Sequence, residues 1–470
     1  MVGQRLLAYG AVVACAVSIS LPPAVGYAAA TPAASNSVTT AAQVAHSQVA
    51  VPPAPTAILP TTVVAGSAAP IPTTVALQQQ LLALLKSPSL GGRGTLSVID
   101  AATGTVLLDS GGSRAQLPAS SLKVLTTATA LRLLGPDTRL VTKVVRGATA
   151  QQIVLVGGGD QTLTRTPSTD SPAGQQLTYA SLTGLAVETA KALKATGTTT
   201  VALSYDNSLF TGPMVAPGWS AGFVASGEVS PVDALSADSG RVSAYSNTRS
   251  LDPAMAAANY FAGALQRLGI TVGPTVVKIN ADASAALVAQ VQSPTVADLV
   301  ERTLTESDND LAEALSHLSG VAIGNGSFAG GAAAVTQTLS LLGIDAAGLV
   351  IRDGSGLSNQ DRVPANVFAR TLSLAALAGP KTVMMWPLLT GMPIAGVTGT
   401  LTIRFVGPAV AGRGVVRAKT GTLTGVSALA GTVRNSSGRV LTFAVMSDAT
   451  TSTYAARVTL DKIAATLASD

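Results

Sequence analysis

Apolar residues recur at helical spacing from Leu77, in the run LQQQLLALLK, so the ordered part of the chain is expected to begin there. Two strand-like runs follow at 94–100 and 105–109, and a turn-prone segment joins them. Residues 119–134 then have the pattern of a helix, which a Gly-Pro pair ends. The pattern therefore predicts a helix, a β-hairpin and a second helix.

The end of the chain repeats this combination of strands and helix. Strand-like runs occur at 415–423, 426–433 and 439–446, and a closing helix is expected over about 454–467. Two strands near the start and three near the end favour one five-stranded antiparallel sheet flanked by helices. The expected fold class is α+β, with the chain between the two groups of strands interrupting the sheet.

That intervening chain is long enough for a domain of its own. A chain of 470 residues exceeds one ordinary core, so two or three domains are expected. Further β-like stretches at 152–156 and 198–204 indicate a β-rich domain inserted at 141–284. The flanking segments, 77–140 and 285–470, would then form the two parts of the domain that holds the five-stranded sheet.

The N-terminus has the pattern of an export signal over residues 1–30. Arg5 precedes an apolar stretch at 6–21, and small residues at 28–30 offer a cleavage site. An uncleaved membrane anchor is the alternative, and a third interpretation makes Cys15 the lipidated residue of a lipobox. The protein is therefore expected to be exported to the cell envelope, either the periplasm or the extracytoplasmic cell wall.

Composition and charge narrow the class of partner. A linker rich in Ala, Pro and Thr is expected at 31–76, and the whole chain is apolar, with 47% hydrophobic and 11% charged residues. The net charge of +5 suits a protein that works beside an anionic envelope. No cluster of Lys and Arg is dense enough for a nucleic-acid-binding surface, so nucleic acid is not an expected partner.

The rarest residues exclude several kinds of active site. Cys15 is the one cysteine, so a mature chain would have neither a disulfide nor a thiol nucleophile. The histidines are His46, in the expected linker, and His317, which is expected to be an ordinary helix residue. A zinc site is thus nearly excluded, and a serine enzyme would need a base other than histidine, for which lysine is the known substitute. No cofactor motif is present, and no cofactor is expected.

Three short patterns, in a fixed order, supply the candidate catalytic residues. They are Ser120-Ser121-Leu122-Lys123 at the start of a predicted helix, Ser307-Asp308-Asn309 before another, and Lys419-Thr420-Gly421-Thr422 in a predicted strand. Residues three apart on a helix share one face, so the Lys123 amine can reach the Ser120 hydroxyl. Backbone N–H groups at the helix N-terminus can also face an oxyanion.

Each pattern alone also has a structural explanation. A Ser-x-x-Lys sequence arises by chance in a chain of this composition, Ser307 can simply cap a helix, and Lys419 can be a solvated strand residue. Asp308 is expected to shape a turn rather than to take part in chemistry. All three patterns in order, each in the right secondary structure, are far rarer by chance, and this favours a functional site.

This set of motifs is typical of class A β-lactamases and penicillin-binding proteins. The chain further resembles the class C low-molecular-weight penicillin-binding proteins, the D-alanyl-D-alanine carboxypeptidase/endopeptidase family. The stretches that carry this resemblance are LPASSLK (117–123), LVGGGDQTL (155–163), YDNSLF (205–210), PGW (217–219), DGSGLS (353–358) and MPIAGVTGTL (392–401). The long gap between the first two motifs leaves room for the inserted domain, which compact β-lactamases lack.

The resemblance implies a serine-type D-Ala-D-Ala carboxypeptidase on the penicillin-binding/serine β-lactamase-like fold. Ser120 would be the acylated nucleophile and Lys123 its base. To serve near neutral pH, Lys123 needs a pKa well below the usual value of about 10.4, and burial with the nearby ammonium of Lys419 is expected to supply it. Ser307 would relay a proton towards the leaving amine, and Asn309 would hydrogen-bond the substrate amide.

The implied substrates are peptidoglycan stem peptides that end in D-Ala-D-Ala, with β-lactam antibiotics as covalent inhibitors. The hydroxyls of Thr420 and Thr422, with Lys419, suit the free carboxylate of such a peptide, and Gly421 between the two threonines is a further expected substrate-binding residue. By the same resemblance, the oxyanion hole would consist of the backbone N–H groups of Ser120 and Thr422.

Two further positions are candidate contacts to the stem peptide. Asp206 matches a family Asp that meets the free amino end of the diamino acid, although an Asx-turn role explains it equally well. Many relatives carry Arg directly after the DGSGLS motif, where this chain has Asn359. Arg362, three residues further on, is the candidate substitute for that Arg.

Two alternative functions stay open. Class A β-lactamases deacylate with a Glu in an E-x-x-x-N pattern, but the Glu that follows Asn309 here is Glu313, and His317 stands four residues further on. Penicillin is therefore expected to form a long-lived adduct, with a serine β-lactamase or esterase on the same fold as the alternative. The second alternative is an inactive relative that recognises stem peptides, and the intact catalytic residues argue against it. Carboxypeptidase and endopeptidase activities break the same kind of bond and are not distinguished.

Overall fold

The computed structural model describes residues 69–71, 75–170, 177–243, 246–377, 379 and 382–469. These residues belong to one compact unit. The expected signal segment, 1–30, and most of the expected linker lie outside them. The helix expected from Leu77 is α1 (Val75–Leu85), which buries Leu77, Leu81 and Leu85 at the four-residue spacing of one helix face.

The first sheet has five strands in the order β13-β14-β15-β1-β2, and all its neighbours are antiparallel. Its strands are β1 (Thr95–Asp100), β2 (Val106–Ser110), β13 (Val416–Leu423), β14 (Val426–Arg434) and β15 (Val440–Ser447). The prediction of one sheet from both ends of the chain is confirmed, and every strand end lies within one residue of its expected position.

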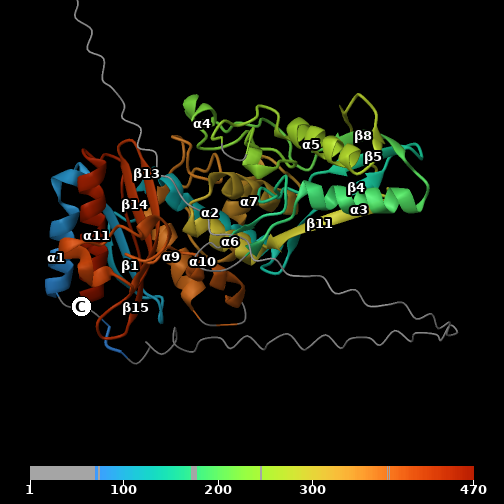
Figure 1. Cartoon of the computed structure of the whole chain (residues 1–470). Helices are drawn as coiled ribbons and strands as arrows, with labels where there is room; N and C mark the ends of the chain where they lie inside the picture. The colour runs from blue at the N-terminus through green and yellow to red at the C-terminus, as the bar shows by residue number, and fades with distance from the viewer. Residues whose placement is uncertain are drawn as a thin grey trace, which may run out of the picture. The chain divides into compact units, whose positions relative to one another are not determined.

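Helices cover both faces of this sheet (Figure 1). On one face α1 and the closing helix α11 (Thr453–Ser469) pack on a core that includes Phe443 and Val445. On the other face α2 (Lys123–Leu134) and α9 (Ala365–Ala376) pack on a core that includes Ala444 and Met446. The alternation along β15 follows from the two-residue period of a strand, whose successive side chains point to opposite faces.

A helical layer next to α2 completes this part of the molecule. Its helices are α6 (Val296–Thr305), α7 (Asn309–Ala322), α8 (Phe328–Leu341) and α10 (Trp386–Thr390). Asp308 is the N-cap of α7, because its carboxylate accepts a hydrogen bond from the Leu311 N–H. This finding agrees with the turn-shaping role expected for Asp308. Ser307 lies in the short connection between α6 and α7.

The inserted segment forms a second, mixed sheet in the order β10-β8-β5-β4-β11, with β9 beside β8. Its strands are β4 (Arg139–Arg146), β5 (Gln152–Val156), β8 (Thr200–Asp206), β9 (Thr271–Val272), β10 (Val277–Lys278) and β11 (Leu287–Thr295). Two helices, α3 (Leu182–Ala195) and α5 (Pro253–Arg267), share its hydrophobic core. Since β11 pairs with β4, this sheet extends past residue 284, where the sequence analysis ended the insertion.

Short elements complete the described chain. They are β3 (Ala115–Gln116) paired with β12 (Val363–Pro364), β6 (Thr169–Asp170) paired with β7 (Leu177–Thr178), the helix α4 (Gly222–Ala225), and the 3-10 turns η3 (Pro88–Leu90), η4 (Ala119–Leu122), η6 (Asp238–Gly240), η7 (Val383–Met385), η8 (Gly399–Leu401) and η9 (Gly407–Gly412). Of the described helices, none is both long and apolar enough to cross a membrane.

Candidate active site

Ser120 lies in the turn η4, directly before α2, as the predicted helix start requires. The preceding residue, Ala119, has a φ of 47°, a left-handed conformation that residues with a Cβ rarely adopt. Strained backbone of this kind concentrates at functional sites. The turn thus presents a half-buried Ser120 at the N-terminal end of α2.

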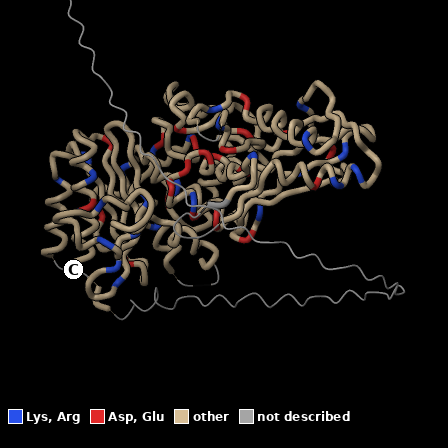
Figure 2. The backbone as a smooth tube through the Cα atoms, viewed as in Figure 1, with Lys and Arg blue, Asp and Glu red and all other residues tan. Residues whose placement is uncertain are grey.

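Lys123 is fully buried, and its amine has three acceptors. The Nζ atom donates to Ser120 Oγ at 3.0 Å, to Asn309 Oδ1 at 2.7 Å and to the Ser355 carbonyl oxygen at 2.8 Å. Burial lowers the pKa of Lys123 to about 8, whereas the carboxylates of Asp353 and Glu313 act in the opposite direction. Figure 2 shows acidic positions gathered around the helices at the centre of the view. The amine of Lys123 therefore lies within hydrogen-bond distance of the Ser120 hydroxyl and has a lowered pKa.

The second and third motifs meet through a hydrogen bond. Lys419, also fully buried, donates from Nζ to Ser307 Oγ at 2.9 Å and to the Thr420 carbonyl oxygen at 2.8 Å. Burial, and next the charge of Lys123, hold the pKa of Lys419 well below its usual range. Ser307 has a φ of 58°, a second left-handed residue beside the site. The expected coupling of the two lysines is thus present, but it acts on Lys419.

A cavity of about 370 Å³ opens onto these groups. Ser120, Ser307, Thr420 and Thr422 all line it, so residues of all three motifs face one space. Thr420 Oγ1 lies 3.0 Å from Thr400 Oγ1, another lining residue. The arrangement has the parts needed for acyl transfer: a hydroxyl nucleophile, an amine within hydrogen-bond distance of it, and a walled space for a substrate.

Gly421 has a structural explanation that the sequence analysis missed. A Cβ atom at this position would lie 2.5 Å from the Pro118 carbonyl oxygen and 3.1 Å from the Ser121 nitrogen. Only glycine therefore lets β13 pass this close to the turn that carries Ser120. Gly421 sets the distance between the first and third motifs, and its expected role in substrate binding is not needed to explain it.

The two candidate stem-peptide contacts are not brought to this cavity. Asp206 ends β8, is 7% exposed, and accepts backbone N–H groups of Ser208 and Ala281 with its two carboxylate oxygens. This is the Asx-turn alternative. Arg362 donates from Nη1 to the carbonyl oxygens of Asn359 and Asp361, in its own loop. Neither residue lines the cavity at Ser120.

His317 is an ordinary residue of helix α7, as expected, and the structure buries it. Its ring lies 4.9 Å from that of Phe210 and 4.6 Å from that of Phe328, centroid to centroid, and burial lowers its pKa to about 4. Glu313 is buried as well, and its two oxygens accept the backbone N–H groups of Gly354 and Ser355. Glu313 is thus engaged with the backbone, which agrees with the absence of a dedicated deacylating Glu from the sequence.

Several residues that support Lys123 and Asn309 were not predicted individually. The Ser355 carbonyl belongs to the DGSGLS motif, and Asp353 of the same motif accepts a hydrogen bond from Trp219 Nε1 of the PGW motif at 2.7 Å. The inserted segment also contributes, because the Glu228 carbonyl accepts from Asn309 Nδ2 at 2.8 Å. The motifs were visible in the sequence, but their contacts arise only in the fold.

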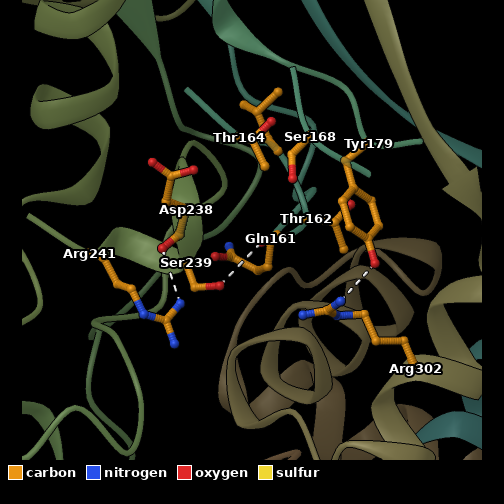
Figure 3. A pocket seen from close by; sticks show the side chains of 10 residues that line it. Gln161, Thr162, Thr164, Ser168, Tyr179, Asp238, Ser239, Arg241 and Arg302 are labelled. Atoms are coloured by element: carbon orange, nitrogen blue, oxygen red, sulfur yellow. Dashed lines mark hydrogen bonds between the residues drawn. The ribbon is translucent and has the colours of Figure 1, made fainter. Parts of the chain in front are cut away.

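A second cavity, of about 390 Å³, lies against the inserted segment (Figure 3). Arg302 of α6 reaches into it and donates to the Tyr179 hydroxyl at 2.7 Å. The same guanidinium pairs with Asp308 at 3.4 Å. Arg302 therefore joins the inserted segment to the N-cap of the helix that begins with Asn309. None of the predicted site residues lines this cavity.

We expect replacement of Glu313 to weaken acylation by way of Lys123. Glu313→Ala leaves two buried N–H groups unpaired, so the loop that holds the Ser355 carbonyl should shift and acylation by penicillin should slow about 100-fold. The charged form of Glu313 raises the pKa of Lys123, and burial raises the pKa of Glu313 itself to about 8, so loss of Glu313 should move only the upper part of the rise in acylation rate, near pH 8, to lower pH. Acylation rates against pH and urea unfolding would measure both effects.

Two further variants separate this role from general destabilisation. Glu313→Gln keeps the volume and one carbonyl acceptor, so a smaller loss is expected. Glu188→Ala removes an exposed carboxylate from α3 and should change neither rate nor profile. A Glu313→Ala protein with the acylation rate and pH profile of the wild type would contradict the positioning role.

Comparison with known proteins decides the family. The D-Ala-D-Ala carboxypeptidase 3 (S13) family matches the chain over residues 77–249 and 244–469. The chain belongs to this family. The match covers both parts of the five-stranded sheet and the inserted segment, as the resemblance had predicted.

Similar proteins match over most of the chain. A carboxypeptidase of Mycobacterium tuberculosis is 36% identical over 414 residues, 84% of this chain and 85% of that protein. Carboxypeptidase DacB of Mycolicibacterium smegmatis is 36% identical over 434 residues, 89% of this chain and 90% of the relative. The structure of penicillin binding protein 4 from Haemophilus influenzae matches with a TM-score of 0.68 and 22% identity, over 84% of this chain and 98% of that one. This chain thus shares its fold with that protein.

Proposed function

We propose that this protein is a serine-type D-Ala-D-Ala carboxypeptidase that acts on peptidoglycan stem peptides through an acyl-enzyme on Ser120. The observation that carries the proposal is the contact of 3.0 Å between Ser120 Oγ and the buried amine of Lys123, whose pKa burial lowers to about 8. Membership of the S13 family supports a peptidase rather than a β-lactamase or an esterase.

In the acylation step, the neutral Lys123 amine accepts the Ser120 proton while Oγ attacks the carbonyl carbon of the penultimate D-Ala. The oxygen of the tetrahedral adduct becomes negative, and the backbone N–H groups of Ser120 and Thr422 donate to it. When the C–N bond breaks, the leaving amine takes a proton from Ser307. Lys419 holds the Ser307 hydroxyl at 2.9 Å, so this proton can be replaced along the same contact. D-alanine leaves and the acyl-enzyme remains.

Deacylation uses the same groups in reverse. Before this step the Lys123 ammonium releases to solvent the proton that it took from Ser120, and Lys419 regains one. Water then gives a proton to the neutral Lys123 amine and attacks the ester carbonyl, and the Ser120 alkoxide that leaves takes that proton back from Lys123. Asn309 orients the acyl part, because its amide is held between Lys123 Nζ and the Glu228 carbonyl. Thr420 and Thr422 bind the carboxylate of the peptide before it is cut.

The same chemistry extends the proposal to related substrates and inhibitors. A cross-link between stem peptides contains the same D-alanyl bond, so DD-endopeptidase activity is included. A β-lactam offers Ser120 a strained amide whose leaving amine stays attached to the acyl group, and a long-lived adduct follows. The export pattern of residues 1–30 supports activity in the cell envelope, where these substrates occur.

The test is incubation of the purified protein with peptidoglycan fragments that carry pentapeptide and cross-linked stems, followed by mass analysis. Loss of one alanine from the pentapeptide is the expected result, and separation of cross-linked dimers would add endopeptidase activity. If neither product forms, and penicillin adds no mass to the protein, the function is instead recognition of stem peptides without catalysis.

A further inference from the structure

The cavity at Ser120 carries more positive charge than its three motifs supply. Besides the motif residues, its lining includes Arg404, Arg457 and Asp461. Arg457 and Asp461 both lie on α11, the closing helix of the chain. This helix reaches the cavity on the side of Thr420 and Thr422, where the proposed function places the carboxylate of the leaving residue.

Arg404 and Lys419 are both engaged with other groups of the protein. Arg404 pairs with Asp461 at 2.6 Å, and the two side chains are 12% and 9% exposed, so their charges offset each other. Lys419 is fully buried, already donates to Ser307 Oγ and to the Thr420 carbonyl oxygen, and does not line the cavity. A carboxylate bound by hydroxyl groups alone would lack a fixed counter-charge.

Arg457 can supply that charge. It lies on the exposed side of α11 and donates from Nη2 to Thr422 Oγ1 at 3.3 Å. Among the described residues, no salt bridge involves Arg457; its charge acts without an ion pair on Asp461, which is already paired with Arg404. A guanidinium stays charged at every pH at which the protein is folded, and it offers two parallel N–H donors that match a carboxylate.

We infer that Arg457 binds the α-carboxylate of the leaving residue, together with Thr420 and Thr422, and so makes the enzyme selective for leaving residues with a free carboxylate. This inference rests on the proposed function and adds a specificity determinant from outside the three motifs. It applies to both activities: the leaving residue of a cross-link would be accepted with a free α-carboxylate and discriminated against once that group is amidated.

The experiment compares two substrates in two proteins. The substrates are an N-acylated tripeptide that ends in D-Ala-D-Ala and the same tripeptide that ends in D-Ala-D-alaninamide. The wild type should prefer the acid, measured as the ratio of the two kcat/KM values. Arg457→Gln should reduce this ratio about 10- to 100-fold by slowing the acid alone, because one charge-assisted contact is lost.

Matched variants and the pattern of loss identify the cause. Arg457→Lys keeps the charge without the two parallel donors and should restore part of the ratio. Arg370→Gln removes an exposed guanidinium from α9, away from the cavity, and should leave both substrates unaffected. An equal loss for acid and amide in Arg457→Gln would overturn the inference, since it would indicate a structural role.

Cleavage of the two substrates by the wild type distinguishes failure of the inference about Arg457 from failure of the proposed function. If the wild type cleaves acid and amide equally well, carboxylate recognition is wrong while the D-Ala-D-Ala carboxypeptidase stands. If it cleaves neither substrate, the proposed function fails and the inference fails with it.

Discussion

The Ser120→Ala variant is expected to lose D-alanine release and penicillin binding together, by a factor of about 10⁴ to 10⁶ in rate. The reason is that Oγ is the atom that becomes acylated, and no other serine hydroxyl is within reach of Lys123 Nζ among the described contacts of that amine. Alanine fits the turn η4, whose strained residue is the neighbouring Ala119. Intact mass after incubation with benzylpenicillin, and D-alanine release, would measure the loss.

Ser121→Ala is the matched control, since it removes a hydroxyl from the adjacent position. Ser121 is buried, and its Oγ donates to the Pro118 carbonyl oxygen at 2.5 Å, away from the reacting groups. We expect this variant to lose some stability but to keep the penicillin adduct. Adduct formation by Ser120→Ala, or its loss in a folded Ser121→Ala protein, would mean that another residue is the nucleophile.

The Lys123→Met variant should slow acylation by about 10² to 10⁴, the usual range for loss of a general base. Methionine is close to the apolar part of lysine in size, so the fully buried side chain can be replaced without a large cavity. The circular dichroism spectrum should stay that of the wild type. Lys86→Met, at an exposed residue directly after α1, is the matched control and should acylate normally.

The pH dependence of the wild type gives an independent test of the same base. Only the neutral amine accepts a proton, and burial lowers the pKa of Lys123 to about 8. The acylation rate should therefore rise from pH 6 and level off above about pH 8. Lys123→Arg should remain inactive throughout, because a guanidinium does not deprotonate in this range. A flat profile in the wild type would contradict the assignment of Lys123 as the base.

Much of the framework follows from local patterns. The strands of the five-stranded sheet have the two-residue alternation of side chains that face different cores, and turns separate them, so their ends were predictable to within a residue. The distance of three residues between Ser120 and Lys123 brings their side chains together on any helix or helical turn. The strand ends and the contact between Ser120 and Lys123 both depend on residues that are close together in the chain, so they can be predicted from the sequence alone.

In the inserted segment, local patterns predict the strands but not which strands pair with each other. Its β-like stretches predicted a β-rich domain, but the pairing of β11 with β4, which extends that sheet past residue 284, is a contact between distant segments. The parallel pairing of β5 with β8 is likewise a long-range choice, and the helices α3 and α5 complete the core. Strand propensity does not specify partners, because the backbone hydrogen-bonding groups of all strands are alike.

By itself, the sequence determined the family, the order of the three motifs, the candidate nucleophile with its amine, and the sheet that carries them. Tertiary structure decided which groups share one space. In the fold, Asp206 and Arg362 make hydrogen bonds to backbone groups away from the cavity, and Gly421 lets β13 pass close to the turn that carries Ser120. The Ser355 carbonyl oxygen accepts a hydrogen bond from Lys123, and Arg457 of α11 donates one to Thr422. These outcomes, and the lowered pKa values of both lysines, depend on burial and on contacts between distant segments, and no local pattern encodes either.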